Sequence, residues 1–129
     1  MYNYFTIQDV RGLPLVGWHI PTNAEWQTLI NTVANANTTY SISAIQQLSA
    51  TNIWSNINCT INNYSNMLFK PAGYRSIKGG DSELGLSTGY WTMDNSGSYA
   101  SIMNFDYKCF MMSTSKYTNC GHSIRCVKD

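Results

Sequence analysis

Chemistry in this chain would depend on two histidines, seven carboxylates and four cysteines. His19 stands just before a sequence typical of a helix start, and we expect it to be packed or hydrogen-bonded in a structural role. His122 follows a glycine near the last predicted strand, where we expect a partly exposed turn residue. The nucleophile elbow, the His-Glu-x-x-His zinc pair, the phosphate-binding loop and the dinucleotide fingerprint are absent. We therefore predict no catalytic residues and a protein that is not an enzyme.

Two pairs of residues have spacings of chemical interest. Asp81 and Glu83 could form one edge of a calcium site, because hard cations take several oxygen ligands, but a solvated turn is our preferred interpretation. Glu25 follows Thr22 at the spacing of a capping box, so we expect its carboxylate to accept from the Thr22 amide. We predict no cofactor and no bound metal.

The four cysteines are Cys59, Cys109, Cys120 and Cys126, and their spacing differs from that of paired zinc ligands. Two disulfides could connect them in three ways, and a Cys109–Cys120 link across a hairpin is sterically feasible. We take unpaired thiols as the default.

Charged residues make up 12% of the 129 residues, about half the usual share. In their place stand 14 Asn, 14 Ser, 12 Thr and nine Tyr. Disorder requires few aromatics and high net charge, so this composition predicts one folded domain over residues 1–129. The net charge of +1 gives no reason to expect a nucleic acid partner, and no apolar stretch is long enough for membrane insertion. The first five residues also lack the features of a signal peptide.

The first half of the chain is predicted to be mainly helical. Residues 4–10 alternate and suggest a first strand, so residues 1–16 are expected to form an N-terminal strand and lead-in. A capped helix is predicted over 22–35, because apolar residues from Trp26 onward recur at helical spacing. A shorter helix is expected over 40–50, followed by a long Asn-rich surface loop.

After residue 66 the pattern changes to short strands and turns. Strands are expected at residues 90–93, 99–106, 107–114 and 123–127. The opening strand is positioned to pair with the closing one. Early helices and late strands together predict an α+β fold with a small, mainly antiparallel sheet.

The aromatic residues divide into two groups. The four tryptophans at positions 18, 26, 54 and 91 are expected in the core or at its edge. The later group lies among Ser, Thr and Asn, and comprises Tyr99, Phe105, Tyr107, Phe110 and Tyr117. Tyrosine offers rigid contact area and small polar residues offer adaptable hydrogen bonds, so the group favours a binding face. For any single member, burial in the sheet is equally expected.

Four phrases in fixed order resemble the Fibrobacter succinogenes major paralogous domain, found largely in bacterial surface and secreted proteins. They are Gly-Trp-His-Ile-Pro-Thr-Asn-Ala-Glu-Trp at 17–26, Lys-Pro-Ala-Gly-Tyr-Arg at 70–75, Gly-Tyr-Trp-Thr at 89–92 and Ser-Ile-Arg-Cys-Val-Lys-Asp at 123–129. The family usually has a cysteine where this chain has Pro14. The partner that the resemblance implies for Cys126 is therefore missing.

The resemblance implies a C-type lectin-like fold: two helices packed on a small, mainly antiparallel twisted sheet, with long loops and paired termini. It also implies structural roles for the residues within the matching phrases, namely Trp18, Thr22, Glu25, Trp26, Trp91 and Arg125. The Glu-Pro-Asn and Gln-Pro-Asp sequences of calcium-dependent sugar binding do not occur.

Domains of this type also serve as the variable proteins of diversity-generating retroelements, in which mutagenesis rewrites Asn codons in a C-terminal segment. Residues 93–122 match that position and character, and Cys109 and Cys120 would then be products of diversification. The candidate ligand-binding residues are Asn95, Ser96, Ser98, Tyr99, Asn104, Asp106, Tyr107, Phe110, Ser113, Ser115, Tyr117 and Asn119.

We therefore expect a ligand-binding domain located on a cell surface, secreted, or carried on a phage virion. Its ligand would be a macromolecule, either a protein or a glycan on a cell surface. One alternative is a structural or adhesive module of a bacterial surface protein or pilus. Another is a metal-dependent enzyme of the formylglycine-generating type. Neither the ligand nor the oligomeric state follows from the sequence.

Overall fold

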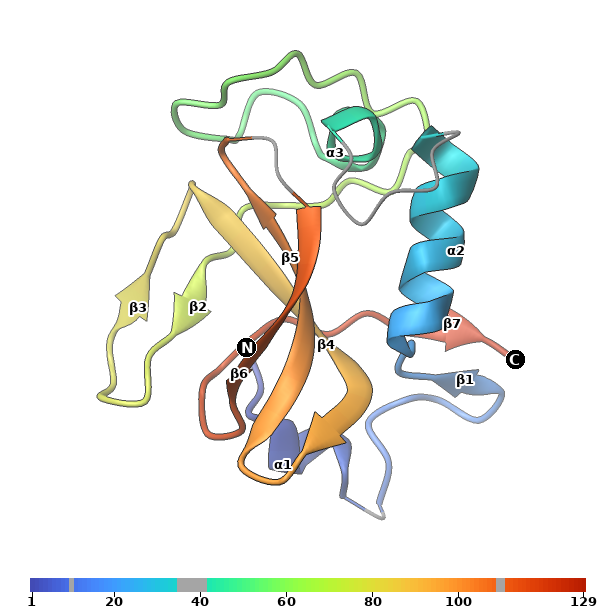
Figure 1. Ribbon diagram of the computed structural model, residues 1–129, viewed down its shortest axis with the longest axis vertical. Helices are drawn as coiled ribbons and strands as arrows, with labels where there is room; N and C mark the ends of the chain where they lie inside the picture. The colour runs from blue at the N-terminus through green and yellow to red at the C-terminus, as the bar shows by residue number, and fades with distance from the viewer. Residues whose placement is uncertain (10, 35–41, 109–110) are drawn as a thin grey trace.

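A computed structural model describes residues 1–129 apart from residues 10, 35–41 and 109–110 (Figure 1). The described chain has an α+β architecture of short helices and small antiparallel sheets, as the sequence predicted. In chain order its elements are α1 (Tyr4–Ile7), β1 (Trp18–His19), α2 (Asn23–Ala34), α3 (Ile42–Leu48), β2 (Tyr74–Arg75), β3 (Asp81–Ser82), β4 (Ser87–Ser96), β5 (Tyr99–Asp106), β6 (Met111–Tyr117) and β7 (Val127–Lys128).

Helix α2 begins at the predicted capping box. The Thr22 amide donates to Glu25 Oε2 over 2.8 Å, and the Glu25 amide lies 3.3 Å from Thr22 Oγ1. Four residues apart on one face, Trp26 and Ile30 are buried, as the helical spacing predicted. The predicted second helix forms as α3, with Leu48 buried at its end. Both helices are therefore set by local sequence.

Strands β4, β5 and β6 form a three-stranded antiparallel sheet with that strand order. Because side chains alternate between the two faces of a strand, each face packs on a different core. The helix-side core contains Trp26, Ile30, Phe69, Tyr90, Met103 and Phe105. The terminus-side core contains Tyr4, Ile7, Ile20, Trp91, Ala100, Ile102 and Cys120. The sheet is thus covered on both faces over much of its length.

The predicted strand at residues 4–10 is wrong, because residues 4–7 form helix α1. The Asn3 side chain accepts from the Thr6 amide over 3.1 Å and caps the turn. Spaced three residues apart, Tyr4 and Ile7 both point into the terminus-side core. The Tyr4 hydroxyl also donates to the Met93 carbonyl over 2.9 Å. Packing against the terminus-side core therefore favours a helix at residues 4–7 over the strand that the alternating pattern predicted.

The two ends of the chain pair as expected, but the N-terminal partner is strand β1 and not the predicted strand at residues 4–10. Strand β1 pairs antiparallel with β7, with Trp18 opposite Lys128 and His19 opposite Val127. The predicted closing strand at 123–127 is therefore shorter and shifted. Trp18 was expected in the core or at its edge, but it is 43% exposed and belongs to neither of the two cores.

The Asn-rich loop after α3 is irregular, as predicted. Its backbone has positive φ at Asn52, Asn56, Asn63 and Asn66. Asparagine tolerates this left-handed region better than most residues, which gives the Asn excess a physical reason. Half-buried Trp54 anchors the loop against the helix-side core.

The cysteines depart in part from the default of unpaired thiols. Cys59 is disulfide-bonded, whereas Cys120 and Cys126 carry free thiols. The suggested Cys109–Cys120 link is therefore wrong, and Cys109 itself lies outside the described residues. The free thiol of Cys126 agrees with the missing cysteine at Pro14.

None of the helices in the described part of the chain is both long and apolar enough to cross a lipid bilayer.

Candidate functional site

Two tyrosines lie side by side at the end of the three-stranded sheet. Tyr99 of β5 and Tyr117 of β6 are directly opposite in the register, and their ring centroids are 4.7 Å apart. Both side chains stay open to solvent, at 44% and 47% exposure. A hydrogen bond with Tyr117 raises the pKa of Tyr99. Cross-strand pairing therefore holds two aromatic rings in place without burying them.

Hydroxyl side chains continue the face on which these tyrosines lie. Ser101 and Ser115 are opposite one another in the register, two residues along from the tyrosines. We define the tyrosine face as Tyr99, Ser101, Ser115 and Tyr117. Figure 1 shows the β4–β5 hairpin beside it at the end of the sheet away from α3.

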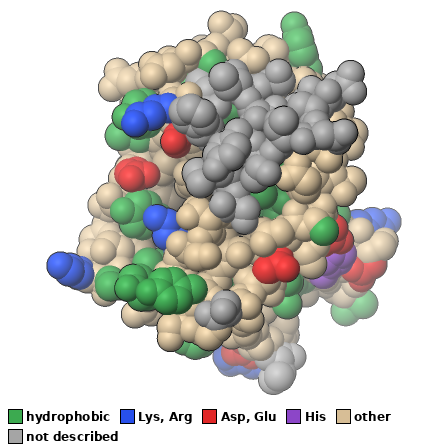
Figure 2. Space-filling model, viewed as in Figure 1, with side chains coloured by type: hydrophobic (Ala, Val, Ile, Leu, Met, Phe, Trp, Pro, Cys, Tyr) green, Lys and Arg blue, Asp and Glu red, His purple; other side chains and the backbone are tan. Residues whose placement is uncertain are grey.

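Two exposed turns flank the tyrosine face. Ser98 lies in the β4–β5 turn and Asn119 in the turn after β6, and both are exposed. The Thr118 amide donates to the Ser98 carbonyl over 3.1 Å, which ties the two turns together. Charges are scattered over a mostly neutral surface in the view of Figure 2. The tyrosine face and its turns thus bring together five of the predicted ligand-binding residues: Ser98, Tyr99, Ser115, Tyr117 and Asn119.

Other predicted residues lie on the opposite face of the sheet. Asn95 is exposed but pairs with Ala100, which packs in the terminus-side core. Asn104, Asp106 and Tyr107 line a groove of about 520 Å³. The predicted set is therefore split between two faces, because alternate strand residues point in opposite directions.

Three predicted residues have no described side chain. Ser96 is opposite Tyr99 in the β4–β5 register, and Ser113 is opposite Met103 in the β5–β6 register. Phe110 lies outside the described residues.

The groove is lined partly by residues that the sequence did not single out as functional. We call it the polar groove, and these additional residues include Tyr74, Thr114, Lys116 and His122. Strand alternation offered a signal for Thr114 and Lys116, since they interleave with Ser113 and Ser115 in β6. Tyr74 comes from β2, far away in sequence, and had no such signal.

His122 is 1% exposed, so the expectation of a partly exposed turn residue is wrong. Its ring stacks on Tyr74 at 5.6 Å and meets Trp91 edge-on at 4.7 Å. Gly89 makes room for it, because a Cβ there would lie 2.8 Å from His122 Nδ1. The missing side chain of Gly89 therefore determines the burial of His122.

Burial lowers the pKa of His122 to about 4, and the positive charge of Lys116 adds to the effect. Neither ring nitrogen has a hydrogen-bond partner among the described residues. The imidazole is therefore neutral at pH 7 and acts as an aromatic packing group beneath the polar groove.

His19 is bound between two carboxylates near the chain end. Its Nε2 lies 2.8 Å from Glu25 Oε1, and its Nδ1 lies 2.6 Å from Asp129 Oδ1. These hydrogen bonds raise the pKa of His19. Hydrogen bonds from Thr22 and His19 lower the pKa of Glu25. The arrangement connects the start of α2 to the β1–β7 pair.

The remaining structural candidates lie in or against the cores. Trp26 packs in the helix-side core and Trp91 in the terminus-side core. The Trp91 indole N–H donates to the Tyr2 carbonyl over 2.7 Å. Arg125 places its guanidinium 4.6 Å from the centroid of the Phe69 ring.

Within the described residues, no group of three or more His, Cys, Asp or Glu side chains could hold a metal ion. Asp81 lies in β3, and the Glu83 carboxylate accepts from the Ser87 hydroxyl over 2.6 Å. Glu83, one of the two residues that suggested a calcium site, therefore uses its carboxylate in a hydrogen bond within the protein.

The family model described as the Fibrobacter succinogenes major domain matches residues 1–128. Comparison with curated proteins and with solved structures gives no match. The match covers all four phrases on which the resemblance was based, except for the last residue.

Proposed function

The chain belongs to the Fibrobacter succinogenes major domain family, and we propose that within it this domain binds a macromolecular ligand through the tyrosine face. The observation that carries the proposal is the exposed, paired arrangement of Tyr99 and Tyr117. Tyrosine contributes large contact area and loses little side-chain entropy on binding. The fixed cross-strand register reduces that loss further.

The neutral surroundings of the pair also support recognition by shape. Ser101 and Ser115 extend the face, and the exposed turns at Ser98 and Asn119 border it. Hydroxyl and amide groups donate and accept hydrogen bonds, so they suit either a protein or a glycan. The ligand that we propose is displayed on a cell surface, and the domain meets it there, in secreted form or on a phage virion.

The scaffold that we propose is C-type lectin-like. Two features support this assignment: the helices α2 and α3 beside a small antiparallel sheet, and the pairing of β1 with β7 near the chain ends. In such a scaffold the two cores remain constant while the sheet end and its turns differ.

We further propose that the domain is the variable protein of a diversity-generating retroelement. Several residues of the 93–122 segment support this by their exposure: Asn95, Ser98, Ser115 and Asn119 can change without disturbing either core. The genomic neighbourhood provides the test. A reverse transcriptase gene and a near-copy of the segment, differing mainly at adenines, are expected beside the coding sequence. Their absence would overturn this part of the proposal.

The binding proposal is tested by replacing both tyrosines. The Y99A/Y117A variant and the wild-type protein are labelled and applied to a glycan array and to intact bacterial cells. We expect the variant to lose at least about tenfold in affinity for whatever the wild type binds, because central tyrosines act as hot spots.

Tyr64 offers a matched control, because it is 81% exposed in the loop after α3. The Y64A variant should bind like the wild type. Binding by Y99A/Y117A that equals the wild type, with the same melting temperature, would refute the tyrosine face as the contact surface.

A further inference from the structure

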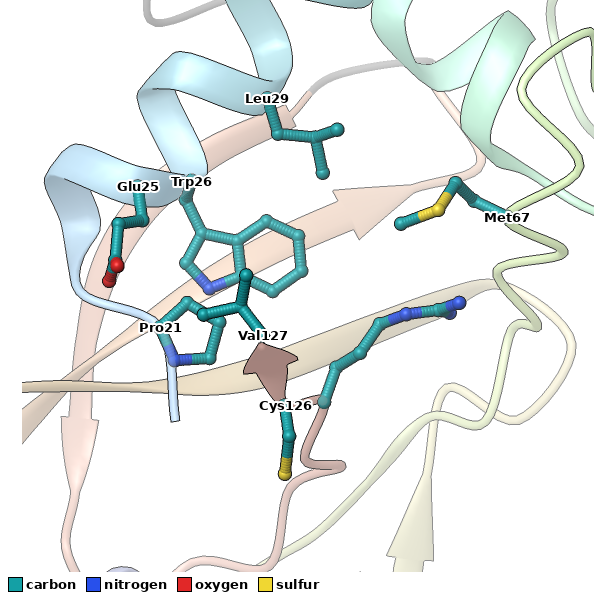
Figure 3. A pocket seen from close by; sticks show the side chains of 8 residues that line it. Pro21, Glu25, Trp26, Leu29, Met67, Cys126 and Val127 are labelled. Carbon is teal, nitrogen blue, oxygen red and sulfur yellow. The ribbon is translucent and has the colours of Figure 1, made fainter. Parts of the chain in front are cut away.

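A second, separate pocket lies between the start of α2, the loop after α3 and the closing segment of the chain. It has a volume of about 150 Å³, and its apolar walls include Trp26, Leu29, Met67 and Val127. Figure 3 shows Trp26 and Met67 pointing toward one another from α2 and from the loop. We call it the Trp26 pocket. None of its lining residues belongs to the tyrosine face.

The size of the Trp26 pocket limits its occupant. An apolar cavity of about 150 Å³ accommodates a benzene-sized molecule. The walls combine an indole ring, a leucine and a thioether, all of which pack well against an aromatic ring or a short alkyl chain. A single ring or a few methylene groups therefore fits inside the Trp26 pocket.

Arg125 gives the Trp26 pocket a cationic side. Arg125 is half-buried, and its guanidinium lies over the Phe69 ring and near the Tyr90 side chain. All seven carboxylate side chains lie within the described residues, and none of them forms an ion pair with Arg125. A guanidinium carries five N–H donors in a fixed fork that matches a carboxylate. Donors therefore remain for an incoming anion.

Glu25 also lines the pocket and determines the orientation of a ligand. Its Oε1 lies 2.8 Å from His19 Nε2, and its Oε2 accepts from the Thr22 amide and hydroxyl. The carboxylate thus belongs to the helix cap, and in Figure 3 it points away from Met67. An anionic group is repelled from this end and attracted to Arg125.

We propose that the Trp26 pocket binds a small carboxylate that carries one aromatic ring or a short alkyl chain. The apolar part packs against Trp26, Leu29 and Met67, and the carboxylate accepts from the Arg125 guanidinium. The Trp26 pocket shares no residue with the tyrosine face, so a failure of either binding proposal leaves the other intact.

The test uses benzoate and its neutral analogue benzyl alcohol, which are similar in size. Each is titrated into the wild-type protein, and binding is followed by saturation-transfer NMR and calorimetry. We expect benzoate to bind about tenfold or more tightly than benzyl alcohol, because a charge-assisted hydrogen bond is among the stronger polar contacts. Equal affinities, or no benzoate binding, would refute the proposal.

Two variants locate the site. R125M should lower benzoate affinity to that of benzyl alcohol, while R75M removes an exposed arginine elsewhere and should change nothing. L29W should fill the pocket and abolish binding of both probes. L84W adds the same ring at a 74% exposed position and should leave the binding of both probes unchanged.

If R125M does not fold, two comparisons still test the proposal: benzoate against benzyl alcohol in the wild type, and L29W against L84W. Unchanged benzoate affinity in L29W would overturn the assignment.

Discussion

At the scale of single residues, neighbours across the fold decide what each side chain does. Histidine is a residue type that often serves in catalysis or metal binding, yet the His122 ring stacks on Tyr74 and meets Trp91 edge-on, and its nitrogens are buried. The sequence placed Tyr99 and Tyr117 with equal weight in the sheet core or on a binding face, and the structure leaves both exposed beyond the helix-side core. Residue type alone did not predict the burial of His122 and did not decide between the two positions of the tyrosines.

The buried imidazole of His122 predicts acid sensitivity. Its pKa is about 4 in the folded protein, against about 6.5 in the unfolded chain. As the pH falls, the unfolded chain therefore takes up the His122 proton before the folded protein does. The stability that the neutral His122 contributes is complete above pH 6.5 and is lost as the pH falls toward 4. We expect a loss of about 3 kcal/mol in the free energy of unfolding over this range, measured by urea denaturation.

Replacing His122 isolates this effect. The H122F variant keeps an aromatic ring but has no proton to bind, so its stability should change less between pH 6.5 and 4. An H19Q control should still lose the stability that depends on His122 between pH 6.5 and 4. His19 acts in the opposite sense, because its raised pKa gives stability that is present below pH 6.5 and lost as the pH rises through the folded value. A wild type with flat stability from pH 6.5 to 4 would contradict the prediction.

At the scale of elements, α2 and α1 show when local sequence is sufficient. Helix α2 carries its own cap in Thr22 and Glu25 and its own apolar face, so its prediction was confirmed. Helix α1 has only four residues, and its position depends on Tyr4 and Ile7 packing under the sheet. An isolated helix of that length is unstable in water, so the Asn3 cap alone could not favour it over a strand.

The capping box predicts a specific difference between two substitutions. T22A removes the side chain that accepts from the Glu25 amide, and we expect the free energy of unfolding to fall by about 1 kcal/mol. E25Q retains an acceptor for the Thr22 amide and should cost less, because glutamine also serves in capping boxes. Urea denaturation at pH 7 measures both. A larger loss for E25Q than for T22A would assign the stabilisation to the His19 contact instead.

At the scale of the whole molecule, the sheet lies between two cores that bring distant parts of the chain together. The helix-side core joins α2, α3 and the loop residue Phe69 to the sheet. The terminus-side core joins α1 to Trp91 and Cys120. The long loop between α3 and β2 has little regular structure, so it is attached by side chains such as Trp54, by the disulfide at Cys59 and by single backbone hydrogen bonds such as that from the Ser55 amide to the Gly85 carbonyl.

Cys59 is therefore expected to contribute most to stability among the described cysteines. C59S removes its disulfide and should lower the free energy of unfolding by about 2–4 kcal/mol. C126S replaces a free thiol and should have a much smaller effect. Thermal melting under non-reducing conditions compares them, and a reductant should bring the wild type close to C59S. Equal melting temperatures for C59S and the wild type would contradict this assignment.

The sequence by itself determined the capped helix α2, the short helix α3, the Asn-rich loop, the strand β5 and membership of the family. It misplaced strand β6, which covers Met111–Tyr117 and not the predicted residues 107–114. The tertiary structure alone decided which face each strand residue presents. It therefore separated Tyr99 and Tyr117 from Asn104 and Asp106, buried His122 and left Arg125 beside an apolar pocket. The physical reason is that capping and turn preferences act over a few residues, whereas burial depends on contacts between segments far apart in the chain.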